Sequence, residues 1–180
     1  MAMTGAGGRG MTPEERDAFL TSGRIFLKIA TTNEDGWPMV SPVWYAWDGE
    51  SFLVVGKERT SYIQNLRRDP RCGLLVDNPA LPYKRVAALA EAEFLPETWD
   101  WKPPTREMII RYIGVEGLSY GEATFEFPRV PVRLWPKRMT TWDGGGFDRT
   151  FHRETVWHDL SGAPAAGSTD AAAGDAGEGR

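Results

Sequence analysis

Apolar residues occur in short runs and alternating stretches through the middle of this chain, a pattern typical of β-strands. These stretches cover residues 25–31, 37–47, 51–55, 71–77, 83–95 and 130–142. Residues 33–36 and 48–49 carry the Asn, Asp and Gly of hairpin turns, and Gly36 suits a left-handed conformation. About six strands joined mainly by hairpins predict a small closed or nearly closed antiparallel barrel.

Two prolines interrupt the second of these stretches. Pro38 and Pro42 have no amide hydrogen to donate to a neighbouring strand, so they are tolerated only where that hydrogen bond is not needed. We therefore expect this part of the chain at a sheet edge, at a bulge or at a barrel corner.

Two further segments predict helices that flank the strands. At residues 12–15 the sequence Thr-Pro-Glu-Glu offers an N-cap, a proline at the first helical position and the glutamate of a capping box. Residues 103–113 begin with two prolines, carry apolar residues at helical spacing and precede Gly114, where a glycine can end the helix. The expected class is mainly β with short helices (α+β).

The segment 56–62 is the first candidate for binding chemistry. It follows a strand, carries Lys57 and Arg59, and leads into a helical pattern. Thr60 or Ser61 is expected as the N-cap, with a side-chain oxygen that accepts from a first-turn amide. Because helix N-termini favour anions and Arg and Lys suit phosphate, the segment predicts a phosphate site. The alternative is a capped surface helix preceded by solvated charges.

Both ends of the 180-residue chain lack the apolar residues of a core. Residues 1–11 and 161–180 are rich in small residues and have too few apolar groups to offset the entropy of ordering, so we expect disordered tails there. Residues 12–160 then form one domain, long enough to bury a sizeable core.

Charge and cysteine content narrow the expected partners. The formal net charge of -4 gives no reason to expect nucleic acid. No uninterrupted apolar stretch approaches the roughly 20 residues that span a bilayer, so no membrane association is expected. The single cysteine, Cys72, cannot form an internal disulfide and is expected to be a buried structural thiol. A cytoplasmic protein is the resulting expectation.

Side chains for metal or nucleophilic chemistry are sparse. His152 and His158 have no Cys or carboxylate at metal-ligand spacing, so no metal site is predicted. No nucleophile-elbow motif occurs, and no catalytic residue is assigned. The glycine-rich run at 142–147 lacks the ending of a phosphate loop and favours a flexible turn. The basic group at 83–85 is either a solvated strand edge or an extension of a phosphate groove.

Several motifs occur in an order and at a spacing that together are fairly specific. They are I-A-T-T at 29–32, D-G-W-P at 35–38, S-P-V-W-Y at 41–45, W-D-G at 47–49, N-L-R-R-D-P-R at 65–71 and L-L-V-D at 74–77. From about residue 25 to 142 the chain resembles the pyridoxamine 5′-phosphate oxidase-like split β-barrel family, which includes FMN-dependent enzymes and deazaflavin (F420)-dependent reductases. The resemblance implies a six-stranded antiparallel split β-barrel flanked by short helices.

The resemblance also implies a homodimer with two flavin-type cofactors at the subunit interface. The residues that match the family's phosphate-binding positions are Lys57, Arg59, Thr60 and Ser61. Those that match its ring-binding strand are Ser41, Pro42, Val43 and Trp44. Trp142 is a candidate ring or substrate contact, from a region that approaches the partner's site in the family, and Lys84 is a candidate extension of the phosphate groove. Tyr62 stands where many members carry a basic residue, so the phosphate must rely on Lys57 and Arg59.

The expected function is that of an FMN-dependent oxidoreductase acting on a small planar organic substrate. F420 is the alternative cofactor, because a groove for its long anionic tail could be lined by Lys28, Lys57, Arg59, Lys84 and Arg85. A second alternative is a non-catalytic protein that binds or carries a flavin, since the sequence shows no obvious acid-base residue. Eight Trp in one modest domain also favour a homodimer that buries aromatic surface.

Overall fold

The computed structural model describes residues 10–80, 82–144 and 158–159. The elements in chain order are α1 (Pro13–Thr21), β1 (Leu27–Thr32), β2 (Pro38–Val43), β3 (Ala46–Trp47), β4 (Phe52–Gly56), α2 (Ser61–Arg68), β5 (Arg71–Asn78), β6 (Lys84–Phe94), α3 (Lys102–Ile113), η1 (Val115–Gly117), α4 (Leu118–Glu122), β7 (Val130–Asp143) and β8 (His158–Asp159). Residues 1–9 and 161–180 of the expected tails lie outside the described residues. Met11, at the edge of the first tail, packs against the core.

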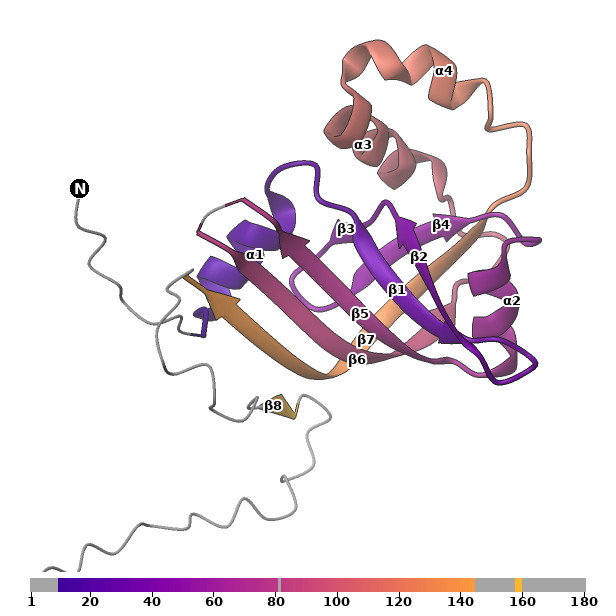
Figure 1. Cartoon of the computed structure of the whole chain (residues 1–180). Coiled ribbons are helices and arrows are strands. Elements are labelled where there is room, and N and C mark those ends of the chain that lie inside the picture. The colour runs from indigo at the N-terminus through magenta and orange to yellow at the C-terminus, as the bar shows by residue number, and fades with distance from the viewer. Residues whose placement is uncertain (1–9, 81, 145–157, 160–180) are drawn as a thin grey trace, which may run out of the picture.

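All strands pair antiparallel in one eight-stranded sheet, in the order β2-β1-β5-β6-β7-β4-β3 with β8 beside β7. Figure 1 shows this sheet curling on itself, with α1 at one end of the curl and α2 near the other. The inward side chains Ile29, Val76, Val86 and Val132 are each at most 1% exposed and form the core. The predicted antiparallel split β-barrel is confirmed.

The second predicted strand, 37–47, is two strands in the structure. β2 and β3 stand at opposite ends of the strand order, and Trp44 and Tyr45 connect them. Tyr45 is 0% exposed, and its hydroxyl donates a hydrogen bond to the Leu20 carbonyl at 2.7 Å. The chain therefore crosses the open side of the barrel here, and β2 is an edge strand, as Pro38 and Pro42 predict. This split, together with β8, explains why the sheet has more strands than the six expected.

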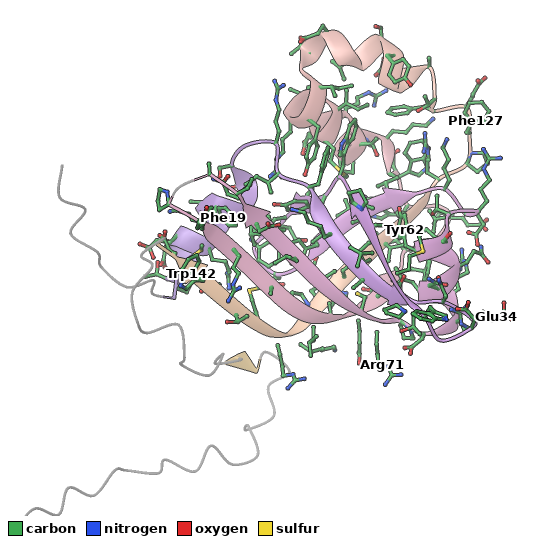
Figure 2. The ribbon with its side chains drawn as sticks, in the orientation of Figure 1. Phe19, Glu34, Tyr62, Arg71, Phe127 and Trp142 are labelled. Carbon is green, nitrogen blue, oxygen red and sulfur yellow. The ribbon has the colours of Figure 1, made fainter. Side chains whose placement is uncertain are left out.

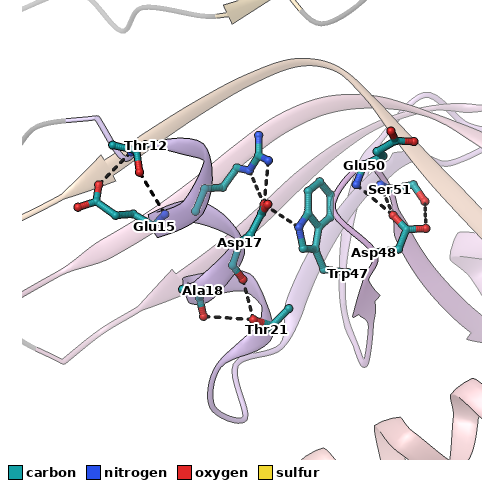
Figure 3. A network of polar contacts seen from close by, with 10 residues as sticks. Thr12, Glu15, Asp17, Ala18, Thr21, Trp47, Asp48, Glu50 and Ser51 are labelled. Atoms are coloured by element: carbon teal, nitrogen blue, oxygen red, sulfur yellow. Dashed lines mark hydrogen bonds and ion pairs between the residues drawn. The ribbon is translucent and has the colours of Figure 1, made fainter.

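The predicted turns form, with one difference in length. Gly36 has φ 85° and Gly49 has φ 99°, both in the region that glycine tolerates best. The second hairpin closes on the pair Trp47 and Phe52, so its loop is longer than the two residues expected from Asp48 and Gly49. The reason is local, because an Asp48 carboxylate oxygen accepts from the Ser51 amide at 2.7 Å and widens the turn (Figure 3).

The start of α1 has the predicted capping box. The Thr12 hydroxyl accepts from the Glu15 amide at 3.3 Å, and the Glu15 carboxylate accepts from the Thr12 amide at 2.9 Å (Figure 3). One turn on, the Asp17 carboxylate accepts from the Trp47 indole at 2.9 Å and ties the helix to β3. These hydrogen bonds hold α1 at one end of the barrel, and each polar group named here has a partner.

An insertion of helices follows β6 and projects from the barrel (Figure 1). It contains the predicted helix α3, which ends at Gly114 with φ 85°, and also α4, which the sequence pattern did not predict. The Arg111 guanidinium fastens α3 by donating to the carbonyls of Leu20 and Gly23, both at 2.9 Å. No helix among the described residues is long and apolar enough to cross a membrane.

Cys72 has the structural role that its sequence context predicts. The side chain is 6% exposed and lies in the core. Burial raises the pKa of its thiol to about 12, with a smaller contribution from the negative charge of Asp69. At neutral pH the thiol is therefore protonated and a poor nucleophile.

Candidate functional site

A hollow of about 260 Å³ opens between the barrel and the helical insertion, and we call it the Trp44 pocket. Five segments of the chain meet there: the end of β2, the connection to β3, the end of β4, helix α2 and helix α3. The lining residues are Val43, Trp44, Val55, Tyr62, Thr105 and Met108. The wall is mostly apolar, which suits a flat organic ring.

A stack of aromatic rings fixes the position of Trp44. Its ring lies 5.1 Å from that of Tyr112 with an angle of 4° between the planes, and the Phe26 ring lies 5.5 Å from Tyr112. The Tyr112 hydroxyl donates to the Ile25 carbonyl at 3.0 Å, so the middle ring is held at its polar end as well. Burial raises the pKa of Tyr112 to about 12, which keeps its phenol neutral.

Tyr62 forms the opposite wall and is packed against the end of β4. A Cβ atom added at Gly56 would lie 2.3 Å from the Tyr62 hydroxyl and 2.8 Å from an Ile63 carbon, so only glycine fits there. Burial raises the pKa of the Tyr62 phenol, while a hydrogen bond with the Thr60 side chain acts in the opposite direction. The phenol is 8% exposed and stays protonated at neutral pH.

The start of α2 differs from the expected capped helix. Thr60 is the N-cap residue, as predicted, but its side chain makes no cap hydrogen bond. Its hydroxyl instead donates to the Lys57 carbonyl at 2.8 Å, because the chain turns tightly between β4 and the helix. The expectation of a side-chain cap from Thr60 or Ser61 is therefore wrong. The first-turn amides are left without a side-chain acceptor from this cap.

The two cations before α2 are both exposed, and no ion pair engages either of them within the described ranges. The carboxylate between them, Glu58, is held by Arg67, with contacts of 2.7 and 2.6 Å to the guanidinium. That contact lowers the pKa of Glu58, and its carboxylate is engaged by Arg67 rather than by Lys57 or Arg59. Lys57 and Arg59 are thus placed beside the Trp44 pocket with their charges uncompensated in this part of the structure.

The second-strand candidates divide between the pocket and the sheet edge. Val43 and Trp44 line the pocket. Ser41 and Pro42 precede them on β2, opposite Ile29 and Lys28 of β1. The predicted ring-binding strand thus reaches the pocket at its carboxyl end.

Lys84 and Trp142 lie at the other end of the barrel. Figure 2 shows Trp142 near α1, at the opposite side of the molecule from Tyr62. Lys84 begins the 11-residue strand β6, and the far end of that strand is up to about 33 Å away along the chain. Lys84 is paired with Asp143 at 3.0 Å, and the Arg85 guanidinium lies 5.8 Å from the Trp142 ring. Within one chain they do not join the other candidates, so their role in the site stays a prediction that requires a second subunit.

Sequence reasoning missed the residues that the insertion brings to the site. Thr105 and Met108 come from α3, where their spacing of three residues places them on one helical face. Arg129 is not among the lining residues, but it directly precedes Val130, which pairs with Gly56 at the end of β4. The helical pattern was visible in the sequence, but nothing in it indicated which side would face the barrel.

The described residues hold no group of three or more His, Cys, Asp or Glu side chains that could bind a metal. His152 and the side chain of His158 lie outside the described part of the chain. The prediction of no metal site is therefore untested for the two histidines themselves.

The chain is a split β-barrel with an apolar pocket beside a cationic helix start, and sequence comparison identifies its family. The family model for pyridoxamine 5′-phosphate oxidase matches residues 12–143, so the chain belongs to that family. Among curated proteins the comparison found no match.

Solved structures agree with this fold. A conserved hypothetical protein from Mycobacterium tuberculosis is 27% identical, with a TM-score of 0.59 over 74% of this chain and 85% of that one. A FAD-binding protein from Mesorhizobium loti is 22% identical, with a TM-score of 0.57 over 79% and 100% of the two chains. An F420 reductase is also 22% identical, with a TM-score of 0.51 over 68% and 94%. The last two similarities show the fold alone.

Proposed function

We propose that this protein binds FMN and works as an oxidoreductase on a small planar organic substrate. The observation that carries the proposal is the position of the Trp44 pocket beside the start of α2, where Lys57 and Arg59 are exposed. An apolar hollow next to a cationic helix start suits a ligand that combines a flat ring with a phosphate. The phosphate contacts in this proposal are Lys57, Arg59 and Ser61, together with the first-turn amides of α2.

In this proposal the chain supplies binding and shielding, and FMN, when bound, supplies the hydride chemistry. Val43, Val55 and Met108 offer an apolar wall that excludes water from a ring. The Thr105 hydroxyl donates to the Trp101 carbonyl at 2.6 Å, and the phenols of Tyr62 and Tyr112 have raised pKa values. None of these groups is suited to accept a proton at neutral pH, which agrees with a site that relies on the cofactor for its reactivity.

F420 remains the alternative cofactor, and the arrangement of cations favours FMN over it. A long anionic tail needs several cations along one groove. Lys28 is paired with Asp77, and Lys84 and Arg85 stand at the far end of β6 beside Asp143 and Trp142. Of the five cations first considered for the tail, Lys57 and Arg59 are the two beside the pocket.

The test is a fluorescence titration of the purified protein with FMN and with F420. We expect FMN to bind and its fluorescence to be quenched. Trp44→Leu should weaken that binding about twofold to tenfold through the loss of about 0.5–1.5 kcal/mol of ring contact. Trp135→Leu is the matched control, because its indole is bonded to Glu93 on another part of the barrel. Failure of the wild-type protein to bind FMN would overturn the proposal, and preferential binding of F420 would select the alternative.

Turnover separates an enzyme from a carrier. We expect bound FMN to be reduced by NADH or NADPH and reoxidised by an added quinone-like acceptor, at a rate that depends on acceptor concentration. A bound flavin that no nicotinamide reduces, with F420 also unreactive, would assign the protein to the non-catalytic flavin-binding alternative.

The proposal includes a homodimer. Trp37 is 72% exposed and Val40 is 62% exposed, both at the β2 edge, and such apolar surface is commonly covered by a partner. We expect sedimentation at micromolar concentration to show a dimer, and Val40→Glu to shift it toward a monomer. Only in a dimer could Lys84 and Trp142 reach a Trp44 pocket, that of the partner subunit.

A further inference from the structure

The ends of β4 and β7 bring a third cation to the side of the Trp44 pocket. Gly56 and Val130 are the last paired residues of these antiparallel strands. Lys57 follows Gly56 and Arg129 precedes Val130, so the two cations stand at the same end of the strand pair. Like charges placed opposite one another across strands destabilise a sheet.

Nearby acidic groups do not explain this arrangement. Glu58 is engaged by Arg67 at 2.6 Å, with Gln64 donating to the same carboxylate at 3.0 Å. Among the residues that the structure describes, no ion pair joins Lys57, Arg59 or Arg129 to a carboxylate. Arg129 donates to the Thr124 hydroxyl at 2.9 Å, a contact that orients its guanidinium without neutralising it.

Arg129 also lies within electrostatic range of the pocket wall. Its positive charge contributes to lowering the pKa of the Tyr62 phenol against the larger effect of burial. Tyr62 lines the pocket and belongs to the helix that Lys57 and Arg59 precede. Arg129 therefore lies near the pocket residue Tyr62, and Lys57 and Arg59 stand in the turn that joins the pocket residues Val55 and Tyr62.

We infer that Arg129 is a third anion-binding residue of this site and that the group it takes is the phosphate monoester of the bound cofactor. The inference rests on the proposed function and deepens it. A phosphate monoester carries close to two negative charges at neutral pH and has three acceptor oxygens, so it can accept from cations on more than one side. Thr124, at the end of the helical insertion, positions the guanidinium, which gives the insertion a role in cofactor selection.

The experiment compares FMN with riboflavin, which has the same ring without the phosphate. Each is titrated into wild type, Arg129→Gln, Arg129→Lys and Arg71→Gln at low salt. Arg71 is an exposed arginine paired with Asp69 at the other end of α2, so its substitution matches the change in net charge. We expect Arg129→Gln to weaken FMN roughly tenfold to hundredfold, the range of a charge-assisted contact, and to leave riboflavin within about twofold. Arg129→Lys should fall between, and Arg71→Gln should change neither ligand by more than about twofold.

A second readout needs no flavin. Inorganic phosphate should raise the melting temperature of the wild-type protein more than that of Arg129→Gln, because only the former holds all three cations. Equal losses of FMN and riboflavin would show that Arg129 acts through the fold, and unchanged FMN affinity would show that it does not touch phosphate. Either result overturns the inference while FMN binding by wild type preserves the proposed function. Wild-type protein that binds neither flavin would overturn both.

Discussion

The two helix starts at opposite ends of the barrel begin alike and are completed differently. At α1, Thr12 and Glu15 cap one another, and Glu14 and Glu15 place negative charge in the first turn. At α2, Thr60 is also the N-cap residue, but its hydroxyl makes no cap bond and the first turn carries no acidic residue. A side chain of α1's own cap accepts from a first-turn amide of that helix, whereas the cap residue of α2 provides no such acceptor.

Charge makes the contrast sharper. The N-terminus of a helix carries partial positive charge, so acidic residues stabilise it and cations next to it do not. α1 follows that rule, while α2 is preceded by Lys57 and Arg59. A chain that places cations beside an uncapped helix start loses stability unless an anion binds there. The two threonines therefore differ in what their hydroxyls do: Thr12 caps its helix, whereas Thr60 donates to the Lys57 carbonyl and leaves the start of α2 uncapped.

The largest expected effect concerns binding at the α2 end. Arg59→Ala should weaken FMN by roughly tenfold to hundredfold, about 1.5–3 kcal/mol, because it removes one charge-assisted contact to the phosphate. The melting temperature of the protein without ligand should stay unchanged, since Arg59 is exposed and forms no ion pair in the described structure. Fluorescence titration at low salt measures the first quantity and calorimetry the second. If wild type and Arg59→Ala bind FMN with equal affinity, Arg59 does not contact the phosphate. The proposal that the start of α2 is a phosphate site would then be wrong.

The next effect is on the fold that supports the pocket. Gly56→Ala should lower the free energy of unfolding by about 1–3 kcal/mol, because the new methyl group would meet the Tyr62 hydroxyl at 2.3 Å. Gly73→Ala is the matched control, since its methyl group would meet Ala30 at an ordinary 3.5 Å. Urea unfolding of both variants makes the comparison. Adding Tyr62→Phe to Gly56→Ala should restore part of the loss, and a Gly56→Ala protein as stable as wild type would show that Tyr62 is not held against β4.

At the α1 end the expected effect is smaller and confined to stability. Thr12→Ala should cost about 1 kcal/mol, the usual contribution of a threonine N-cap, and should leave FMN affinity unchanged. Chemical denaturation and the FMN titration check the two halves of this statement. A change in FMN affinity would mean that the α1 end contributes to binding, either within one chain or, in a dimer, at the pocket of the partner subunit.

The sequence contained most of the fold and only part of the site, for identifiable reasons. The strands, α1 with its capping box and the proline-bearing edge strand all depend on local patterns, so they could be predicted. The break between β2 and β3 could not, because it depends on Tyr45 reaching the Leu20 carbonyl across the barrel. The contribution of Met108 to the pocket depends on how the insertion packs against the barrel, and that is set by tertiary contacts.

The smallest expected effect tests the helix comparison most directly. Thr60→Ala removes the hydroxyl that donates to the Lys57 carbonyl, but there is no cap bond to lose, so the cost should be about 0.5 kcal/mol, below that of Thr12→Ala. The Tyr62 phenol would lose its Thr60 partner, yet it lines the Trp44 pocket, where water can replace that contact. FMN affinity should fall by less than about tenfold, because the cations and amides remain in place. Parallel urea curves for the two alanine variants decide the matter: equal losses would mean that Thr60 caps α2 in solution just as Thr12 caps α1.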